Sequence, residues 1–487
     1  MAELCDLTIK ELSGDLKSRK ISAQEVAKSV VDRMKTTEKD VDAYLDTYED
    51  EALAEAEKLD KKADFNHELY GIPCSIKDAL LIKGKKTTAA SKVLENYIAP
   101  YTATSVQNLI DKGAVITGKT NMDEFAMGSS TEVSAYKVTK NPWDLKRVPG
   151  GTSGGATASV AAGSSIYGIG SDTGGSIRQP ASFCSVTGLK PTYGMVSRYG
   201  LIAHASGFDQ VSVAARSVED AAIVLTGIAG RDQKDATSFS GRYRNLQKSM
   251  KEPMKGMKIG VPKEYFDEGL DDEVRKSVEQ GIMQMKQLGA TISDVSLSLT
   301  KYSLPAYYIL VSAEASSNLA RYDGIRYGER NEEAQDLLET YMKTRSDKLG
   351  IEVKRRILMG TYVLSAGYKD AFYKKAQQVR SLIKDEFEHM FSQVDLVVGP
   401  ASPVPPFKIH ERTSDPLSMY LMDVYTGQAN LIGSPAMSVP CGFTKEGLPI
   451  GLQFTANKFD EGKILRAGYW YQQDTDWHKQ KPQLIQE

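Results

Sequence analysis

The sequence predicts an α/β fold made by one interwoven domain over residues 1–487. Strand-like and helix-like segments alternate between residues 70 and 120, as they do in α/β proteins. Two apolar runs near the C-terminus, 436–443 and 448–455, flank a short glycine-containing turn, which is typical of a β-hairpin. No repeat of about 20–50 residues is present and no shift in composition marks a linker, so we expect one domain rather than several.

The other elements follow from periodicity and capping signals. Residues 8–60 are predicted to be helical, because Ser22 and Glu25 have capping-box spacing and apolar residues follow at helical intervals. A long helical region rich in charge and tyrosine is predicted over 310–392. Strands are predicted at 72–76, 114–117, 257–261 and 394–398, and further helices at 105–112 and 218–230.

Composition indicates a globular enzyme and argues against several other classes. The 61 basic and 63 acidic residues give a net charge of −2, whereas a dedicated nucleic-acid binder needs a basic surplus. The four cysteines lie far apart without CxxC spacing, which excludes a disulfide framework and a zinc site and fits a reducing cytosol. The N-terminus has no signal-peptide pattern, and no apolar stretch approaches the roughly 18 residues of a membrane span. We therefore expect a cytoplasmic enzyme.

Two short segments match the residue patterns of known functional motifs, but the residues before them do not fit the structure that each motif requires. Residues 113–120 satisfy the Walker A pattern, but a helical segment precedes them and their interior favours a strand, so we interpret them as a helix-turn-strand connection. A P-loop ATPase stays as a remote alternative. Residues 151–155 satisfy the G-x-S-x-G pattern of a nucleophile elbow, but a polar, proline-containing segment precedes them instead of a strand. The five histidines are scattered in dissimilar contexts, which disfavours a Ser-His-Asp enzyme: His67, His204, His389, His410 and His478.

The centre of the chain differs sharply from its flanks. Residues 150–200 hold 12 of the 40 glycines, and between 150 and 189 only Asp172 and Arg178 are charged. A flexible Gly/Ser linker is the alternative interpretation. Apolar residues are interspersed through the whole segment, however, as burial requires. We therefore predict a buried site in which the backbone approaches another group closely.

A serine nucleophile is predicted in this segment. Ser176 follows Gly174 and Gly175, and consecutive glycines can turn their N–H groups toward one point, where they would stabilise the oxyanion formed when the serine attacks a carbonyl. No histidine lies nearby in the sequence. A lysine can act as the base if burial lowers its pKa, and Lys77, at the end of an apolar run, is the best candidate.

Three segments of the sequence, together with Lys77, resemble a known family. Residues 150–155, 171–180 and 188–194, together with Lys77, are similar to the amidase signature. The resemblance implies the amidase signature fold, a central mixed β-sheet covered by helices on both faces. It also implies an N-terminal helical segment over about 1–65, a signature core over about 66–240, and a C-terminal half that completes the sheet and the substrate pocket. Residues 121–132 narrow the similarity to the A subunits of glutamyl-tRNA(Gln) amidotransferases.

The resemblance assigns a catalytic role to several positions. The family uses a Ser-Ser-Lys triad, in which Ser176 would be the acyl-enzyme nucleophile and Lys77 the base at the end of the proton relay. The middle member is a serine in a cis peptide, and here that position is Thr152, which keeps the hydroxyl. Relay through Thr152 is the preferred hypothesis, and Ser153 is the alternative. The oxyanion hole would be formed by backbone N–H groups of Thr173, Gly174, Gly175 and Ser176.

Substrate-binding residues are implied in the same way. An amino-acid substrate carries an ammonium and a carboxylate, which call for an acid and an arginine. The resemblance places Asp423 on the amino group, Arg356 on the carboxylate and Tyr307 in the lining of the pocket; taken alone, each could be an ordinary ion-pair or packing residue. Asp172 and Arg178 are expected to brace the glycine loops rather than to contact substrate.

The resemblance implies a glutaminase subunit. It would hydrolyse glutamine and supply ammonia to a B subunit, which uses ATP and Mg²⁺ to convert Glu-tRNA(Gln) to Gln-tRNA(Gln) and holds most of the tRNA. A small C subunit would complete the heterotrimer. No cofactor or metal is expected in this chain. A free-standing amidase acting on small amides is one alternative, and an assembly subunit with weakened catalysis, suggested by the departure at Thr152, is another.

Overall fold

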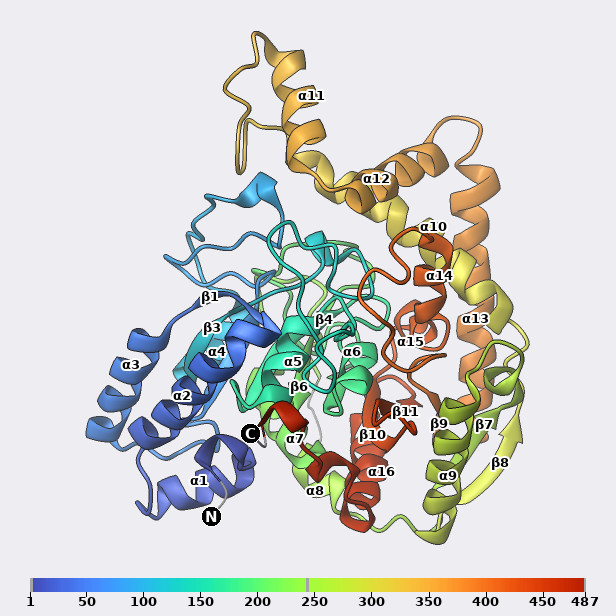
Figure 1. Ribbon diagram of the computed structural model, residues 1–487. Coiled ribbons are helices and arrows are strands. Elements are labelled where there is room, and N and C mark those ends of the chain that lie inside the picture. Colours follow the sequence, from blue (N-terminus) through green and yellow to red (C-terminus); the bar gives the residue numbers. More distant parts are fainter. Residues whose placement is uncertain (1–2, 242–244, 486–487) are drawn as a thin grey trace.

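An eleven-stranded β-sheet runs through the computed structural model, which describes residues 3–241 and 245–485 (Figure 1). The strands are β1 (Tyr44–Thr47), β2 (Pro73–Lys77), β3 (Val115–Thr120), β4 (Tyr167–Asp172), β5 (Thr187–Lys190), β6 (Gln210–Ala215), β7 (Lys258–Pro262), β8 (Thr291–Val295), β9 (Leu396–Pro400), β10 (Ala436–Phe443) and β11 (Pro449–Ala456). Their order across the sheet is β1-β3-β2-β4-β6-β5-β10-β11-β9-β7-β8.

The sheet is mixed, as the resemblance implied. Strand β2 pairs in parallel with both β3 and β4, and β7 pairs in parallel with β8 and β9. The central pairs β4–β6, β5–β6, β5–β10 and β10–β11 are antiparallel. Because β2 and β4 are parallel neighbours, their carboxyl ends meet at one edge of the sheet, and this edge carries the candidate site.

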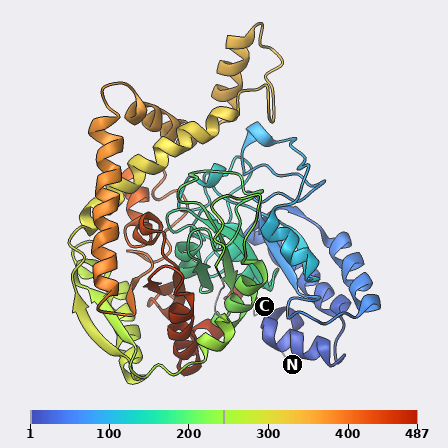
Figure 2. The same ribbon diagram turned by 180° about the vertical axis from the view of Figure 1, so that it is seen from behind.

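Helices cover both faces of the sheet (Figures 1 and 2). On β11, Gly451 faces Ser182 of α6, while the next residue, Leu452, points to the opposite face and contacts Gly281 of α9. The helices are α1 (Ile9–Lys17), α2 (Ala23–Val41), α3 (Glu49–Lys62), α4 (Thr104–Asp111), α5 (Gly154–Ala162), α6 (Arg178–Phe183), α7 (Val218–Ile228), α8 (Leu246–Met250), α9 (Asp272–Gln287), α10 (Thr300–Asn318), α11 (Leu337–Lys348), α12 (Ile351–Leu364), α13 (Lys375–Phe391), α14 (Pro416–Tyr420), α15 (Gly427–Ile432) and α16 (Glu461–Asp474).

Most predicted elements are confirmed, including the capping box at Ser22 and the C-terminal hairpin, which forms β10 and β11. The long helical region is α10 to α13, but the prediction of helix throughout 310–392 is wrong for residues 322–336, which form turns and loops. Figure 1 shows α11 projecting beyond the rest of the molecule. The prediction of helix throughout 8–60 is wrong for β1. There the chain leaves α2 at Asp42, in a left-handed conformation, and Tyr44 is buried against β3, so pairing with a distant strand overrides the local pattern.

The glycine-rich centre is buried, and the linker interpretation is therefore excluded. Every residue from 162 to 192 is buried, and the segment contributes β4, α6 and β5. No helix in the described part of the chain is long and apolar enough to cross a membrane.

The Walker A spelling at 113–120 is a helix-turn-strand connection, as predicted. The chain passes from α4 through a turn into β3, and Lys119 lies within that strand rather than at a loop. Its side chain is fully buried, and its ammonium lies 2.8 Å from the carboxylate of Asp78 and 3.0 Å from the hydroxyl of Thr87. Lys119 is therefore one half of a buried ion pair.

Replacing Lys119 by alanine should destabilise the fold, because it leaves the Asp78 carboxylate buried without a cation. We expect a loss of about 3–5 kcal/mol in the free energy of unfolding, measured by urea denaturation. The matched control is Lys83→Ala, at an exposed lysine nearby, which should change stability by less than about 0.5 kcal/mol. A stable Lys119→Ala protein that had lost bound nucleotide would instead support the P-loop alternative.

Candidate active site

Lys77 ends strand β2 and points its amine into a cluster of hydroxyl groups. Its Nζ lies 2.7 Å from Thr152 Oγ1, 2.8 Å from Ser153 Oγ and 2.9 Å from Ser171 Oγ. The side chain is completely buried. Burial lowers the pKa of Lys77 to about 7, although the more distant charges of Asp123, Asp172 and Asp209 oppose the shift. A substantial fraction of this amine is therefore neutral near neutral pH and can accept a proton.

Thr152 lies at a cis peptide bond with Gly151, two residues before the start of α5. The backbone around it is held by side chains from elsewhere in the core. The N–H of Gly151 donates to Gln179 Oε1 at 2.9 Å, and Thr131 Oγ1 donates to the carbonyl of Gly150 at 2.7 Å. These bonds fix the position from which Thr152 reaches Lys77.

Ser153, the alternative relay residue, has a different set of partners. Its hydroxyl donates to the carbonyl of Ser171 at 2.9 Å and accepts from Lys77 Nζ. Because a serine hydroxyl has a single proton, that proton is already committed to the backbone.

Ser176 lies in the short turn between β4 and α6, at the same edge of the sheet as Lys77. The residue is 7% exposed, and its carbonyl accepts from the N–H of Ser153 at 3.0 Å. Among the residues that the structure describes, no hydrogen bond joins Thr152 Oγ1 to Ser176 Oγ. The second step of the predicted relay therefore stays a prediction.

The turn before Ser176 presents a row of backbone amides. The N–H of Gly175 donates to Asp172 Oδ1 at 3.0 Å, so a substrate oxyanion would have to compete for it. The N–H groups of Thr173, Gly174 and Ser176 donate to no acceptor within residues 3–241 and 245–485. Unpaired amides in a buried turn are rare, and together these three can bind an anion.

Asp172 and Arg178 brace this turn, as predicted. Both side chains are fully buried, and Arg178 Nε lies 3.0 Å from Asp172 Oδ2. Burial opposes ionisation of Asp172, but the adjacent guanidinium of Arg178 holds its pKa at about 2. Arg178 also donates to Asn430 Oδ1 and Gln453 Oε1, both at 2.6 Å. The pair thus ties the catalytic turn to the C-terminal half of the chain.

The structure brings the three predicted substrate-binding residues together beside that turn. Tyr307, on α10, lies so close to Gly174 that a Cβ at that glycine would be 2.2 Å from the tyrosine hydroxyl. Asp423 accepts from the hydroxyl of Tyr308, the next residue on α10, at 2.6 Å. The guanidinium of Arg356, on α12, lies 4.7 Å from the ring centroid of Tyr308.

The two charged members of this group differ in their electrostatics. Burial raises the pKa of Asp423 to about 7, with the hydrogen bond from Tyr308 opposing the shift, so this carboxyl group titrates near neutral pH. Arg356 is buried, and its Nε donates to Glu352 Oε1 at 2.7 Å. Its remaining nitrogens carry further N–H donors that can bind a substrate carboxylate.

Sequence reasoning missed several residues of the site. Ser171 supplies the third hydroxyl group around Lys77 Nζ, and Glu352 orients Arg356 through a hydrogen bond. Tyr308 and Tyr420 stack on each other with their ring centroids 4.2 Å apart and contact Asp423 and Glu352, respectively. Ser171 lies inside the motif at 171–180, so its position beside a buried lysine could have been found. The others lie in ordinary helical sequence that carries no such signal.

The chain is similar to known proteins over nearly its whole length. A family model described as Amidase matches residues 25–465. A protein from Thermoanaerobacter pseudethanolicus, named as the A subunit of glutamyl-tRNA(Gln) amidotransferase, is 53% identical over 485 residues, which cover 99% of each chain. A protein of the same name from Carboxydothermus hydrogenoformans is 52% identical over 485 residues, 99% of this chain and 100% of the relative.

A solved structure has a similar fold. The crystal structure of the glutamyl-tRNA(Gln) amidotransferase A subunit from Thermotoga maritima superposes with a TM-score of 0.79 at 39% sequence identity. The match covers 96% of this chain and 94% of that one. The similarity therefore extends over nearly the whole fold.

Proposed function

The chain belongs to the amidase family, and from its active site we propose that it hydrolyses glutamine and supplies the ammonia to partner subunits of a tRNA-dependent amidotransferase. The observation that carries the proposal is the buried amine of Lys77, which is hydrogen-bonded to Thr152 beside a serine on a turn of unpaired amides. Such an arrangement suits attack on an amide carbonyl, which needs a base and an anion site together.

The proposed reaction begins with attack of Ser176 Oγ on the side-chain amide carbon of glutamine. The serine proton passes to Thr152, whose own proton passes to the neutral amine of Lys77. The N–H groups of Thr173, Gly174 and Ser176, with that of Gly175 where it can leave Asp172, stabilise the resulting oxyanion. The C–N bond then breaks, and the leaving nitrogen takes the proton back through the relay and departs as ammonia. Water hydrolyses the remaining glutamyl ester by the same route and releases glutamate.

We assign the relay to Thr152 rather than to Ser153. Both hydroxyls lie within hydrogen-bond distance of Lys77, but the Ser153 proton is donated to the Ser171 carbonyl. Passing on that proton would break this hydrogen bond in the core. Thr152 has no such commitment within the described residues, so its hydroxyl can donate to the amine when the amine is neutral.

Recognition of free glutamine is proposed for the cluster beside the turn. Asp423 would bind the substrate ammonium and Arg356 its carboxylate, while Tyr307 forms the wall next to Gly174. A buried carboxyl group that binds the ammonium and a buried guanidinium that binds the carboxylate together fix the orientation of an amino acid. The amide would then lie toward Ser176.

Further subunits are proposed from the names of the relatives, each of which is the A subunit of an amidotransferase. A B subunit would take the ammonia, activate Glu-tRNA(Gln) with ATP and Mg²⁺ and bind most of the tRNA, and a C subunit would complete a heterotrimer. The net charge of −2 supports this division, because it gives this chain little attraction for tRNA.

Ser176 should form a covalent adduct with a diazoketone analogue of glutamine, because a nucleophilic serine attacks its electrophilic carbon. Mass spectrometry of the complex with its partners should locate the adduct on Ser176, and Ser176→Ala should abolish both labelling and glutaminase activity. An intact complex without adduct would support the alternative in which this chain serves assembly. Glutaminase activity that is indifferent to the partners would support the free-standing amidase.

Thr152→Val should lower kcat for glutamine hydrolysis by about 10²–10⁴-fold, because valine keeps the shape but removes the relay hydroxyl. The matched control is Ser153→Ala, which also removes a hydroxyl bonded to Lys77. Its effect should fall mainly on stability, by about 1–3 kcal/mol, since it removes a buried hydrogen bond to the Ser171 carbonyl. If Ser153→Ala lost turnover while Thr152→Val kept it, the relay would run through Ser153.

Turnover should increase with pH through about 7. Burial lowers the pKa of Lys77 from its usual range to about 7, and only the neutral amine can accept a proton. At saturating glutamine, kcat should therefore fall about tenfold for each pH unit below 6 and level off above 8. The pKa of Asp423 is also raised to about 7, and its titration should change KM, because the ionised form binds the substrate ammonium. A kcat that is constant between pH 5 and 8 would contradict the role of Lys77.

A further inference from the structure

His204 lies on a loop that is held firmly at its backbone. Its N–H donates to Asp209 Oδ2 at 2.9 Å, and its carbonyl accepts from Asn318 Nδ2, on α10, at 3.1 Å. Two residues later, the carbonyl of Ser206 accepts from the hydroxyl of Tyr193 at 2.7 Å and from the guanidinium of Arg198.

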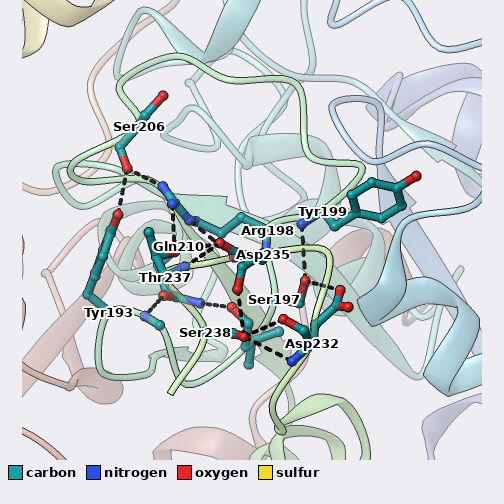
Figure 3. A network of polar contacts seen from close by, with 12 residues as sticks. Tyr193, Ser197, Arg198, Tyr199, Ser206, Gln210, Asp232, Asp235, Thr237 and Ser238 are labelled. Atoms are coloured by element: carbon teal, nitrogen blue, oxygen red, sulfur yellow. Dashed lines mark hydrogen bonds and ion pairs between the residues drawn. The ribbon is translucent and has the colours of Figure 1, made fainter. Parts of the chain in front are cut away.

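Figure 3 shows how the neighbouring loops secure Arg198. Its N–H donates to Asp235 Oδ2 at 2.8 Å, and its guanidinium donates to Thr237 Oγ1 at 2.7 Å. Asp232 accepts from the hydroxyl of Ser197 at 2.6 Å in the same network. The loop that carries His204 therefore has a defined position.

The imidazole ring of His204, unlike the backbone of its loop, makes no hydrogen bond within the described chain. The residue is 2% exposed, and within the described chain neither Nδ1 nor Nε2 has a hydrogen-bond partner. A neutral imidazole has one donor and one acceptor, and leaving both unpaired in a protein interior opposes folding. A buried imidazole with both nitrogens unpaired can donate a hydrogen bond to a group that reaches it.

The same loop lies against the active site on two sides. Asp209, which anchors the His204 N–H, also accepts from Thr173 Oγ1 at 2.7 Å, beside the proposed oxyanion site. Phe208 packs edge-on against Tyr307, with ring centroids 5.9 Å apart. Burial, and then the positive charges of Arg356 and Lys77, hold the pKa of His204 well below its usual range, so the ring is neutral and lies within electrostatic range of both cations.

We propose that His204 is a further substrate-binding residue, whose ring N–H donates a hydrogen bond to the carboxylate of the amino-acid substrate beside Arg356. This inference rests on the proposed glutaminase function. Arg356 gives its Nε to Glu352, and two hydrogen bonds from its other nitrogens would still leave acceptor positions open on a carboxylate, whose two oxygens have about four. A neutral imidazole supplies a directional donor without adding a third charge to the pocket.

The test compares His204→Phe, which keeps a ring but removes both nitrogens, with His204→Gln, which keeps a donor. Both are made in the full chain and assayed with its partner subunits. KM for glutamine should increase about tenfold or more in His204→Phe, with little change in kcat, and His204→Gln should recover most of the loss. The melting temperature of the free His204→Phe protein should stay the same or increase, because two unpaired buried polar atoms have been removed.

Two substrate analogues identify the group that His204 contacts. Glutaramate has the carboxylate but no ammonium, and γ-aminobutyramide has the amine but no carboxylate. His204→Phe should weaken the hydrolysis of glutaramate as strongly as that of glutamine and leave that of γ-aminobutyramide unchanged. Equal losses on both analogues, or an unchanged KM for glutamine with a lower melting temperature, would overturn the inference and indicate a packing role. If the wild-type complex failed to hydrolyse glutamine at all, the proposed function itself would be wrong.

Discussion

The candidate site depends on keeping one amine buried without giving it a salt bridge. Three carboxylates, Asp123, Asp172 and Asp209, act on Lys77 from a distance, but within the described chain none of them forms an ion pair with it. A direct pair would stabilise the ammonium and return the pKa of the lysine to its ordinary range. Hydroxyl groups serve instead, because they can accept from the charged amine and donate to the neutral one.

Each of these carboxylates is occupied by other donors. Asp172 pairs with Arg178, and Asp209 accepts from Thr173 and from backbone amides. Asp123 accepts from the N–H groups of Thr131 and Val133 at 3.0 and 3.1 Å. The same bonds that withhold the carboxylates from Lys77 also fix the surrounding loops. The chemistry of the lysine and the shape of the site therefore have a common cause.

The sequence was sufficient where function depends on local chemistry. The positions of Lys77, Ser176 and the glycine pair follow from short motifs, and the structure places all of them at the carboxyl ends of two parallel neighbouring strands. It was insufficient where function depends on packing. Tyr308 meets Asp423 across 115 residues of chain, and strand β1 forms only because β3 offers it an edge. A hydroxyl whose proton is already committed, as in Ser153, is also visible only in three dimensions.

Glycine occupies the two positions before Ser176 because a side chain would not fit at either one, and not only because glycine is flexible. A Cβ at Gly174 would lie 2.2 Å from the hydroxyl of Tyr307, and one at Gly175 would lie 2.2 Å from Thr426 Oγ1. The space that side chains would fill is taken by residues from the C-terminal half, and Thr426 also donates to the carbonyl of Gly174 at 2.6 Å. The turn that carries the nucleophile is thus in direct contact with the wall of the proposed substrate pocket. Because no side chain separates them, a displacement of α10 would change the substrate pocket and the row of amides together. Substrate binding and catalysis therefore depend on the position of the same helix.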